Sequence, residues 1–562
     1  MKIKNIYQGL FLLCLSLLVG CNDFLEPKPD NRLTEEQVLE NPILAEGWLL
    51  KAYKGLPNNY NFNTDASSDD AELNNPNAAS RRMNSGGWAA NDNPFGIWSK
   101  AYEMNLYLNT FISYVDDIEW SWTSEDRDQY YRTRLKAEAH ALRAWYGFQL
   151  LQAHAGKANS GELLGFPIVT SVLTAEDDIN IQRSTFAECV DYIIQDCDAA
   201  LAGLPDKWED TGDADYNHVF GLRNENRING LAIKILKSRL ALYAASPAYD
   251  DAAAATWQIA ADYALEAVQA NGGMVLDPSD ITYYLDFNSA EVAWGASKRN
   301  NANNWEADNF PPSLYGEGLT NPTQDFVEAF PMADGLPIGH PASTFDPSNP
   351  YANRDPRLST YVIYNGMDFK GSIIRTYVNG GADGIGASNN IATVSGYYLK
   401  KFMDENVVLD PTNNVGTEHY YTYARMTEAY LNLAEAANEL GGPDQSIGGF
   451  TPRQIINDLR ARAGITNTTY IDGVTTRAEM RDVIHNERRI ELSFEGHRFW
   501  DIRRWEELDE ITTDVKGMRI SADQSTYEIF DLAERNYKTY QVYGPIPFNE
   551  ILKYDIQQNA GW

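Results

Sequence analysis

The chain is poor in cysteine, which bears on how its fold is held together. Only four cysteines occur in 562 residues. Cys189 and Cys197 lie within the body of the chain, eight residues apart in a segment predicted to be helical. Eight residues rise about 12 Å along a helix, which exceeds the limit of roughly 7 Å between the Cα atoms of a disulfide. We therefore expect two buried thiols and a fold stabilised by its core.

The chain also lacks a long apolar run in its body, so no segment there is expected to cross a bilayer as a helix, which needs roughly 20 apolar residues. The segment from Leu10 to Val19 is apolar but short, follows Lys2 and Lys4, and ends beside Gly20-Cys21. This pattern is typical of a bacterial lipoprotein leader. We predict a signal peptide over residues 1–20 and acylation of Cys21, the lipid being the only membrane anchor. An ordinary secretory peptide with an incidental cysteine is the alternative.

Basic residues are scarce relative to acidic ones. The chain has 46 Lys and Arg against 79 Asp and Glu, which gives a formal net charge of −33. Such a surface repels nucleic acid and anionic headgroups, so neither is an expected partner. Aromatic residues are plentiful instead, with 33 Tyr and 13 Trp. Rings of this kind, together with the asparagines of the loops, suit stacking on sugars and hydrogen bonding to hydroxyls.

Apolar and alanine residues recur at helical spacing in several separate blocks. The predicted helices run from Arg127 to Ala155, Thr185 to Leu204, Arg227 to Ala245, Ala252 to Asn271, Ala424 to Leu440, Thr451 to Ala463 and Arg477 to Phe494. Short links join them into pairs, as in tetratricopeptide repeats, although no strict 34-residue period is visible. The sequence predicts a mainly α fold built from degenerate tetratricopeptide-like helix pairs.

The stretch from Val275 to Glu418 differs in character, because it is rich in Asn, Gly, Pro and aromatic residues. Strand-like runs occur at Tyr361 to Tyr364 and at Gly396 to Lys400. We predict an irregular subdomain with a few short strands, inserted at about 275–418 into a helical scaffold of about 21–274 and 419–562. Residues 21–562 would form one domain, and the loops held by its scaffold are the expected place for binding.

Two carboxylates lie on an otherwise apolar helical stripe near the C-terminus. Glu487 and Glu491 share this stripe with Met480, Ile484 and Phe494. A catalytic acid/base pair, as in glycoside hydrolysis, is one interpretation. We favour a structural ion-pair network, because the stripe points into the core and buried carboxylates need partners. The candidate partners are Arg460, Arg462, Arg488, Arg498, Arg503 and Arg504.

The run Arg-Arg-Ile-Glu-Leu-Ser-Phe-Glu-Gly-His-Arg-Phe-Trp-Asp-Ile-Arg-Arg at 488–504 resembles the C-terminal signature of the SusD/RagB family of Bacteroidetes outer-membrane lipoproteins. Further matches follow in the family's order over nearly the whole chain. They are Trp98 to Tyr102 with Asn109, Lys136 to Phe148, Gly165 to Val169, Phe330 to Gly335, Arg354 to Leu358, Arg425 to Glu439 and Asn457 to Gly464.

The resemblance implies a helical, tetratricopeptide-like fold that sits as a lid on a TonB-dependent SusC-like transporter, lipid-anchored to the outer membrane and facing the cell exterior. Such proteins capture oligosaccharides, and some members handle peptides; they are not enzymes. The resulting prediction is a glycan-binding lipoprotein that delivers oligosaccharides to its transporter. The alternatives are a peptide-capturing lipoprotein of the RagB type and, less favoured, a glycoside hydrolase.

In SusD-like proteins the ligand site is a shallow aromatic arc built from loops, and the resemblance implies a similar site here. Two segments here have that composition, Asp69 to Asn93 and Glu291 to Tyr315. Trp305, set among asparagines, is the preferred stacking platform; the alternative is that it plugs a loop onto the scaffold. Trp294 and Trp98 are expected in the core. The candidate ligand-binding residues are Arg82, Trp88, Asn91, Asn304, Trp305 and Tyr315.

The sequence contains no zinc-binding His-Glu-x-x-His, no Gly-x-Ser-x-Gly elbow, no phosphate loop and no cysteine cluster. No catalytic residue, metal site or cofactor is therefore predicted. A structural calcium ion at the acidic run from Asp65 to Asp70 stays open but cannot be assigned, because the spacing of an EF-hand loop is missing.

Overall fold

The computed structural model describes residues 34–562. The predicted leader and Cys21 lie outside the described residues. The longer helices are α4 (Pro42–Lys54), α6 (Trp98–Tyr114), α7 (Glu125–His154), α8 (Phe186–Leu201), α10 (Gly230–Ala245), α11 (Trp257–Ala270), α15 (Met426–Gly441), α16 (Pro452–Arg462) and α18 (Arg477–Glu491). The shorter ones are α3 (Glu35–Leu39), α5 (Ala79–Arg82), α9 (Ala214–Phe220), α12 (Asn304–Asn309), α13 (Gln324–Ala329), α14 (Pro356–Tyr361), α17 (Thr469–Asp472), α19 (Arg498–Arg504), α20 (Leu508–Thr512) and α21 (Phe548–Lys553).

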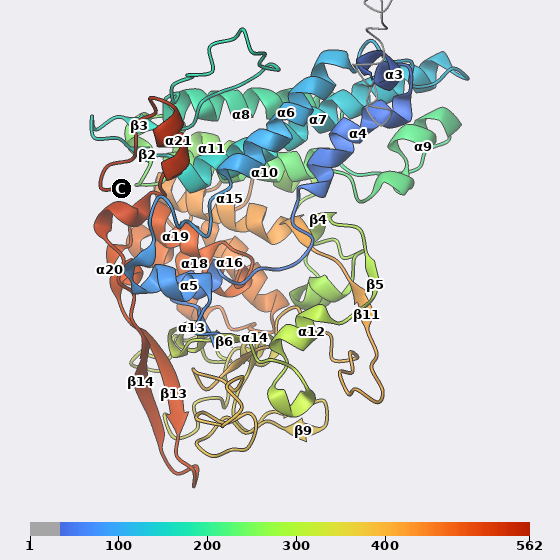
Figure 1. Ribbon diagram of the computed structural model, residues 1–562. Coiled ribbons are helices and arrows are strands. Elements are labelled where there is room, and N and C mark those ends of the chain that lie inside the picture. The colour runs from blue at the N-terminus through green and yellow to red at the C-terminus, as the bar shows by residue number, and fades with distance from the viewer. Residues whose placement is uncertain (1–33) are drawn as a thin grey trace, which may run out of the picture.

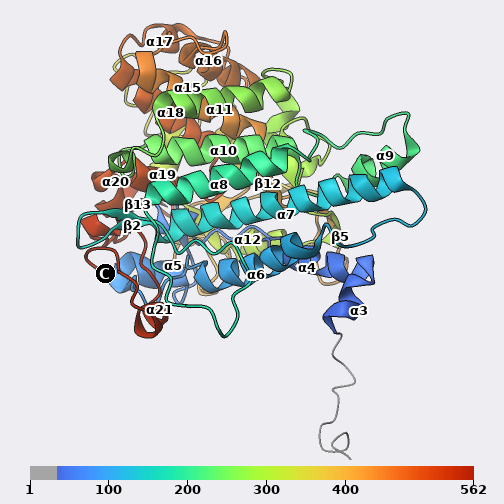
Figure 2. The same cartoon turned by 90° about the horizontal axis from the view of Figure 1, so that it is seen from above.

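The long helices form a continuous stack of neighbours. Helix α6 packs on α7, α7 on α8, α8 on α10, α10 on α11, α11 on α15 and α15 on α18. Figure 1 shows this stack in the upper and central parts of the molecule, and Figure 2 shows α7, α8, α10 and α11 lying side by side. The prediction of a mainly helical fold with tetratricopeptide-like pairing is confirmed.

Local sequence explains where two central helices begin. The Ser124 side chain accepts a hydrogen bond from the Arg127 amide and so caps α7. Thr185 and Glu188 form the predicted capping box of α8. Each arrangement satisfies amide groups that a helix start leaves without an intrahelical partner. Cys189 and Cys197 both lie on α8, fully buried and unpaired, which confirms the prediction of core thiols.

Two predicted helix boundaries were wrong for backbone reasons. The helix expected from Ala252 starts only at Trp257, because Ala253 has a left-handed φ of 49° and Thr256 caps the helix that follows. The helix expected to reach Phe494 ends at Glu491, and Phe494 itself has a φ of 59°. A left-handed residue cannot continue a right-handed helix.

The strands of the described residues are short and pair two by two in antiparallel fashion. The pairs are β1 (Ala71–Leu73) with β6 (Thr320–Pro322), β2 (Gly156–Lys157) with β3 (Leu163–Leu164), β4 (Val292–Gly295) with β12 (Thr422–Arg425), β5 (Arg299–Ala302) with β11 (Thr417–His419), β7 (Val362–Ile363) with β10 (Tyr398–Leu399), β8 (Asp368–Phe369) with β9 (Ser372–Ile373), and β13 (Val515–Ile520) with β14 (Tyr527–Ala533). The two strand-like runs expected from the sequence contain β7 and β10, which pair with each other.

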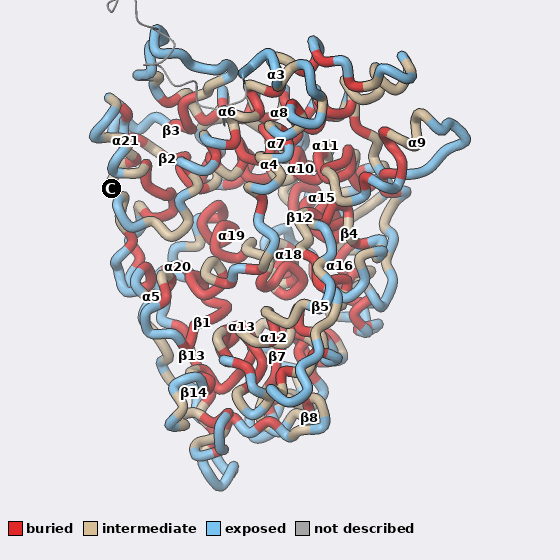
Figure 3. The backbone as a smooth tube through the Cα atoms, turned by 45° about the vertical axis from the view of Figure 1, so that its right-hand side comes forward, coloured by how far each residue is buried: buried red, intermediate tan, exposed pale blue. Residues whose placement is uncertain are grey.

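Within residues 34–562, the buried apolar side chains form two groups. One fills the helical stack, and the other lies among the short elements of 275–418, joined by Phe62, Ile490 and Phe494 from outside that range. In Figure 3 the buried backbone of both groups lies inside a shell of exposed loops. Helix α18 therefore contributes to both, through Ile484 on one side and Ile490 on the other. No helix within residues 34–562 is both long and apolar enough to cross a membrane.

Candidate functional site

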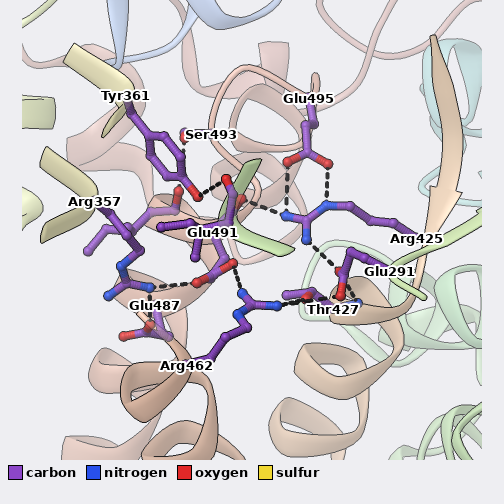
Figure 4. Close-up of polar contacts among 12 residues, drawn as sticks. Glu291, Arg357, Tyr361, Arg425, Thr427, Arg462, Glu487, Glu491, Ser493 and Glu495 are labelled. Carbon is purple, nitrogen blue, oxygen red and sulfur yellow. Dashed lines mark hydrogen bonds and ion pairs between the residues drawn. The ribbon is translucent and has the colours of Figure 1, made fainter. Parts of the chain in front are cut away.

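The two carboxylates of α18 are fully buried and held by arginines. Arg357 of α14 donates hydrogen bonds to both, with its Nη1 lying 2.7 Å from Glu491 Oε1. Arg460 Nε donates to Glu487 Oε2 over 2.9 Å, and Arg462 Nη2 pairs with Glu491 Oε2. Figure 4 shows the contacts from the Arg357 guanidinium to Glu487 and to Glu491. The predicted ion-pair network is confirmed.

The surrounding charges keep these carboxylates ionised. Burial by itself raises the pKa of Glu491, but the guanidiniums of Arg462 and Arg357 outweigh it and hold the pKa below its ordinary value. The same balance, with Arg357 and Arg460 as partners, lowers the pKa of Glu487. A general acid needs a raised pKa and access to substrate. Neither carboxylate has these properties, so the acid/base interpretation of this pair is wrong.

Sequence reasoning found only part of the network. Of the six arginines expected as partners, Arg460 and Arg462 contact the two carboxylates. The others are engaged elsewhere: Arg488 and Arg504 with Asp501, Arg498 with Asp69, and Arg503 over the ring of Phe499. The central partner, Arg357, was missed. It lies within the motif Arg354 to Leu358, but no spacing rule links it to Glu487, which is 130 residues away.

The acidic run at 65–70 is packed against the C-terminal signature. The Asp69 carboxylate pairs with Arg498 at 2.8 Å, and Asp70 pairs with Arg489 at 2.6 Å. Asp65 is 1% exposed, and burial raises its pKa to about 8. Calcium is bound by ionised carboxylates that are free to coordinate it. Asp69 and Asp70 are instead paired with arginines, and Asp65 favours its neutral form. No cluster of three or more His, Cys, Asp or Glu within residues 34–562 could hold a metal ion.

Trp88 does not present its ring to solvent, so its prediction as a ligand-stacking residue is corrected. Its side chain is 4% exposed. The ring packs edge-to-face against Trp562 at 4.9 Å and near Phe499 at 5.8 Å, and its Nε1 donates to Asn93 Oδ1. The C-terminal segment covers this tryptophan, which local composition could not reveal.

Trp305 is likewise buried, at 1% exposure, so the predicted stacking platform is corrected as well. Its ring stacks on His419 with centroids 4.4 Å apart, and the guanidinium of Arg299 lies 5.3 Å from the ring. Its Nε1 donates to Asn59 Oδ1. A ring covered on both sides leaves no face for a sugar. Trp305 therefore fixes a loop to the scaffold, as the alternative interpretation had it. Trp294 and Trp98 are buried as expected.

The other four candidate residues reach the surface to different degrees. Tyr315 is 60% exposed. The exposed Arg82 pairs with Asp92 at 3.3 Å, Asn91 is exposed, and half-buried Asn304 donates to Asn59 Oδ1.

The structure does not bring these residues together in one site. The segment around 82–91 hydrogen-bonds with Asn536 and Phe548, whereas the segment around 304–315 bonds with Asn59 and Asp383.

Two family models match this chain. The model described as "SusD family" matches residues 287–562, and the model described as "Starch-binding associating with outer membrane" matches residues 23–218. Residues 219–286, which include α10 and α11, lie between the two matches. The chain belongs to the SusD/RagB family.

Relatives and solved structures agree with this assignment. The chain is similar to SusD-like protein P38 of Formosa agariphila, 23% identical over 92% of this chain and 94% of that protein. It is 32% identical to SusD-like protein P25 of the same organism, over only 23% of this chain and 21% of the relative. A SusD-like protein from Bacteroides fragilis superposes with a TM-score of 0.76 at 22% identity, covering 95% of this chain and 100% of the other. At such identities the structural likeness establishes the fold.

Proposed function

We propose that the protein is a cell-surface lipoprotein that binds oligosaccharides and delivers them to a TonB-dependent SusC-like transporter of the outer membrane. The observation that carries the proposal is the match of two SusD-type family models to both halves of the chain. Two structural neighbours are described as a carbohydrate-binding and a laminarin-binding SusD-like protein, with TM-scores of 0.70 and 0.60 at 20% and 18% identity, covering 92% and 93% of this chain and 99% and 100% of theirs.

The proposal is of a binding protein without catalytic activity. Glu487 and Glu491 are the pair that most resembled a hydrolase site. Both are paired with arginines and buried from solvent, which supports the proposal. Binding would take place on the loops, where Tyr315 offers an exposed ring and Asn304, Asn91 and Arg82 offer amide and guanidinium donors. These four side chains are the proposed ligand contacts, Arg82 and Asn91 at one place on the surface and Asn304 and Tyr315 at another.

Attachment through Cys21 is the membrane part of the proposal. The lipoprotein-like leader supports it, as does the reference to the outer membrane in the description of one family model. Cys21→Ala should abolish acylation and release the protein from the membrane fraction. The measurement is metabolic labelling with a fatty-acid analogue together with fractionation, with Cys189→Ala as the control. A variant that stays membrane-bound would contradict anchoring through Cys21.

A binding screen tests the function. The purified protein would be titrated calorimetrically with plant, host and microbial glycans and with mixed peptides, and the same samples would be analysed for cleavage products. We expect saturable glycan binding without products, weakened by Tyr315→Ala. Products would show an enzyme, and binding of peptides alone would show a RagB-type function instead.

A further inference from the structure

A cleft separate from the loop residues lies where α7 faces β12. Its volume is about 140 Å³, and none of the six candidate ligand-binding residues lines it. Five distant parts of the chain meet there: Pro57, the Trp145–Gln152 face of α7, Arg239 of α10, the β12 region from Tyr421 to Glu428, and the turn of Glu495 to His497. The fold thus builds this cleft from positions that no single sequence segment reveals.

Aromatic rings form its walls. Trp145 and Phe148 come from α7, Tyr423 comes from β12, and Tyr421 directly precedes that strand. The centroids of Trp145 and Tyr423 are 6.3 Å apart in an edge-to-face arrangement. The two α7 rings are buried, whereas the two tyrosines are half-buried and reach the opening. Such walls favour a ligand with apolar C–H faces.

The charged groups in the cleft cancel one another. Arg239 binds both carboxylate oxygens of Glu428 at 2.5 Å. Arg425 binds Glu495 in the same way, at 2.7 and 2.9 Å, as Figure 4 shows. His497 is neutral at physiological pH, because burial lowers its pKa to about 4. A charged ligand would find no uncompensated opposite charge here, and desolvating it would be costly.

Polar groups remain available at the rim. The side-chain amide of Gln149 is half-buried and makes no hydrogen bond with the described residues. Gln152 uses its Nε2 to donate to Tyr243 Oη at 2.9 Å, which leaves its Oε1 free to accept. Two amides above aromatic walls can both donate to and accept from hydroxyl groups.

We propose that this cleft binds one neutral, hydroxyl-rich ring of monosaccharide size, an inference that rests on the proposed glycan-binding function. The size follows from the volume, since sites for larger ligands hold roughly 300–1,000 Å³. The ligand should be neutral because Arg239 is already paired with Glu428 and Arg425 with Glu495. A longer glycan would enter with a single unit, held between the α7 rings and the two tyrosines and oriented by Gln149.

The test fills the cleft and compares affinities. Gln149→Trp places an indole at the rim, and Gln129→Trp, at an exposed position of the same helix, is the matched control. Titrations would use neutral monosaccharides, their uronic acid and amino-sugar counterparts, and the glycan found in the screen. We expect Gln149→Trp to weaken binding of the neutral sugar at least tenfold with an unchanged thermal midpoint, and Gln129→Trp to have no effect. Gln149→Ala, which removes the amide without added bulk, should weaken binding severalfold and serves if the tryptophan variant fails to fold.

The outcomes separate this inference from the function on which it rests. Glycan binding that is weakened by Tyr315→Ala but unaffected by both Gln149 variants would overturn the cleft assignment and leave the proposed function standing. Equal or tighter binding of charged sugars would overturn the assigned ligand class. A wild-type protein that binds no glycan would overturn the proposed function itself.

Discussion

Arg357 is the side chain on which the buried charges around α18 converge. It is fully buried and pairs with Asp355, Glu487 and Glu491. Removing one partner of a buried pair leaves an uncompensated charge, which typically costs about 3–5 kcal/mol. We expect Arg357→Met to lower the free energy of unfolding by that order in urea titrations. Arg82→Met, which removes an exposed ion pair, should change it by less than about 1 kcal/mol. Similar values for both variants would refute the structural role of Arg357.

Glu495 predicts how stability responds to acid. Burial raises its pKa, but Arg425 and Lys401 overcome this and lower the pKa from 4.5 to about 2. A carboxyl with a depressed folded pKa stabilises the protein above its unfolded pKa, and this contribution is lost as the pH falls through the folded pKa. The loss should therefore occur between about pH 4.5 and pH 2.

Glu495→Gln should be less stable than the wild type at pH 7, by a few kcal/mol, and should show a flatter pH dependence across that window. Chemical unfolding at a series of pH values measures this. Glu528→Gln, on the exposed face of β14, is the control and should keep the wild-type profile. A Glu495→Gln profile parallel to that of the wild type would contradict the prediction.

At the residue scale, the sequence predicted which side of a helix is buried better than it predicted which residues contact each other. The helical wheel placed Glu487 and Glu491 on a buried stripe, because that periodicity is local. Their partner Arg357, and the His419 that covers Trp305, come from segments more than 100 residues away. Composition suggested an exposed Trp305, but exposure depends on what packs against the loop. Tertiary contacts of this kind have no local signal.

At the element scale, capped helices with alanine-rich interiors were predictable, and interrupted ones were not. The start of α8 follows from the predicted capping box of Thr185, whereas α7 begins at Glu125 after the cap Ser124, two residues before the predicted Arg127. The break before α11 depends on Ala253, whose left-handed φ no sequence rule demands of alanine. In the region 275–418, β7 pairs with β10 through Ile363 and Tyr398, which are 35 residues apart, so the sequence indicated strand character but not the pairing.

Ala253→Gly should therefore stabilise the protein. A left-handed conformation costs an L-residue roughly 1–2 kcal/mol, which glycine avoids, although the greater freedom of glycine in the unfolded chain offsets part of the gain. We expect a gain of up to about 1 kcal/mol in urea unfolding. Ala254→Gly, at a neighbouring position without a positive φ, should destabilise instead. A loss of stability in both variants would show that Ala253 is not strained.

For the whole molecule, stability should not depend on disulfides. Cys189 and Cys197 are unpaired and fully buried, and burial raises the pKa of Cys189 to about 12. Reactive thiols are exposed and have a low pKa. We expect the same thermal midpoint with and without reductant, and no reaction of these two thiols with a thiol reagent until the protein unfolds. Rapid labelling of either native thiol would contradict the packing of α8.

Fold class and family were readable at the largest scale, because many motifs in a fixed order constrain a chain more than any one of them does. The ligand contacts were not readable in the same way. Of the candidate residues, the two tryptophans proved to be packing residues, while the cleft at α7 and β12 combines positions from 57 to 497 that share no motif.

The salt bridges between Asp69 and Arg498 and between Asp70 and Arg489 impose an order of events on folding. These partners are 429 and 419 residues apart, so the early segment stays unpaired until almost the whole chain has been synthesised. Contacts of such long range form late and slowly. A chain interrupted before residue 489 would keep its early acidic residues without partners and could not close its core. Only a chain that includes the C-terminal signature can therefore pair these early carboxylates.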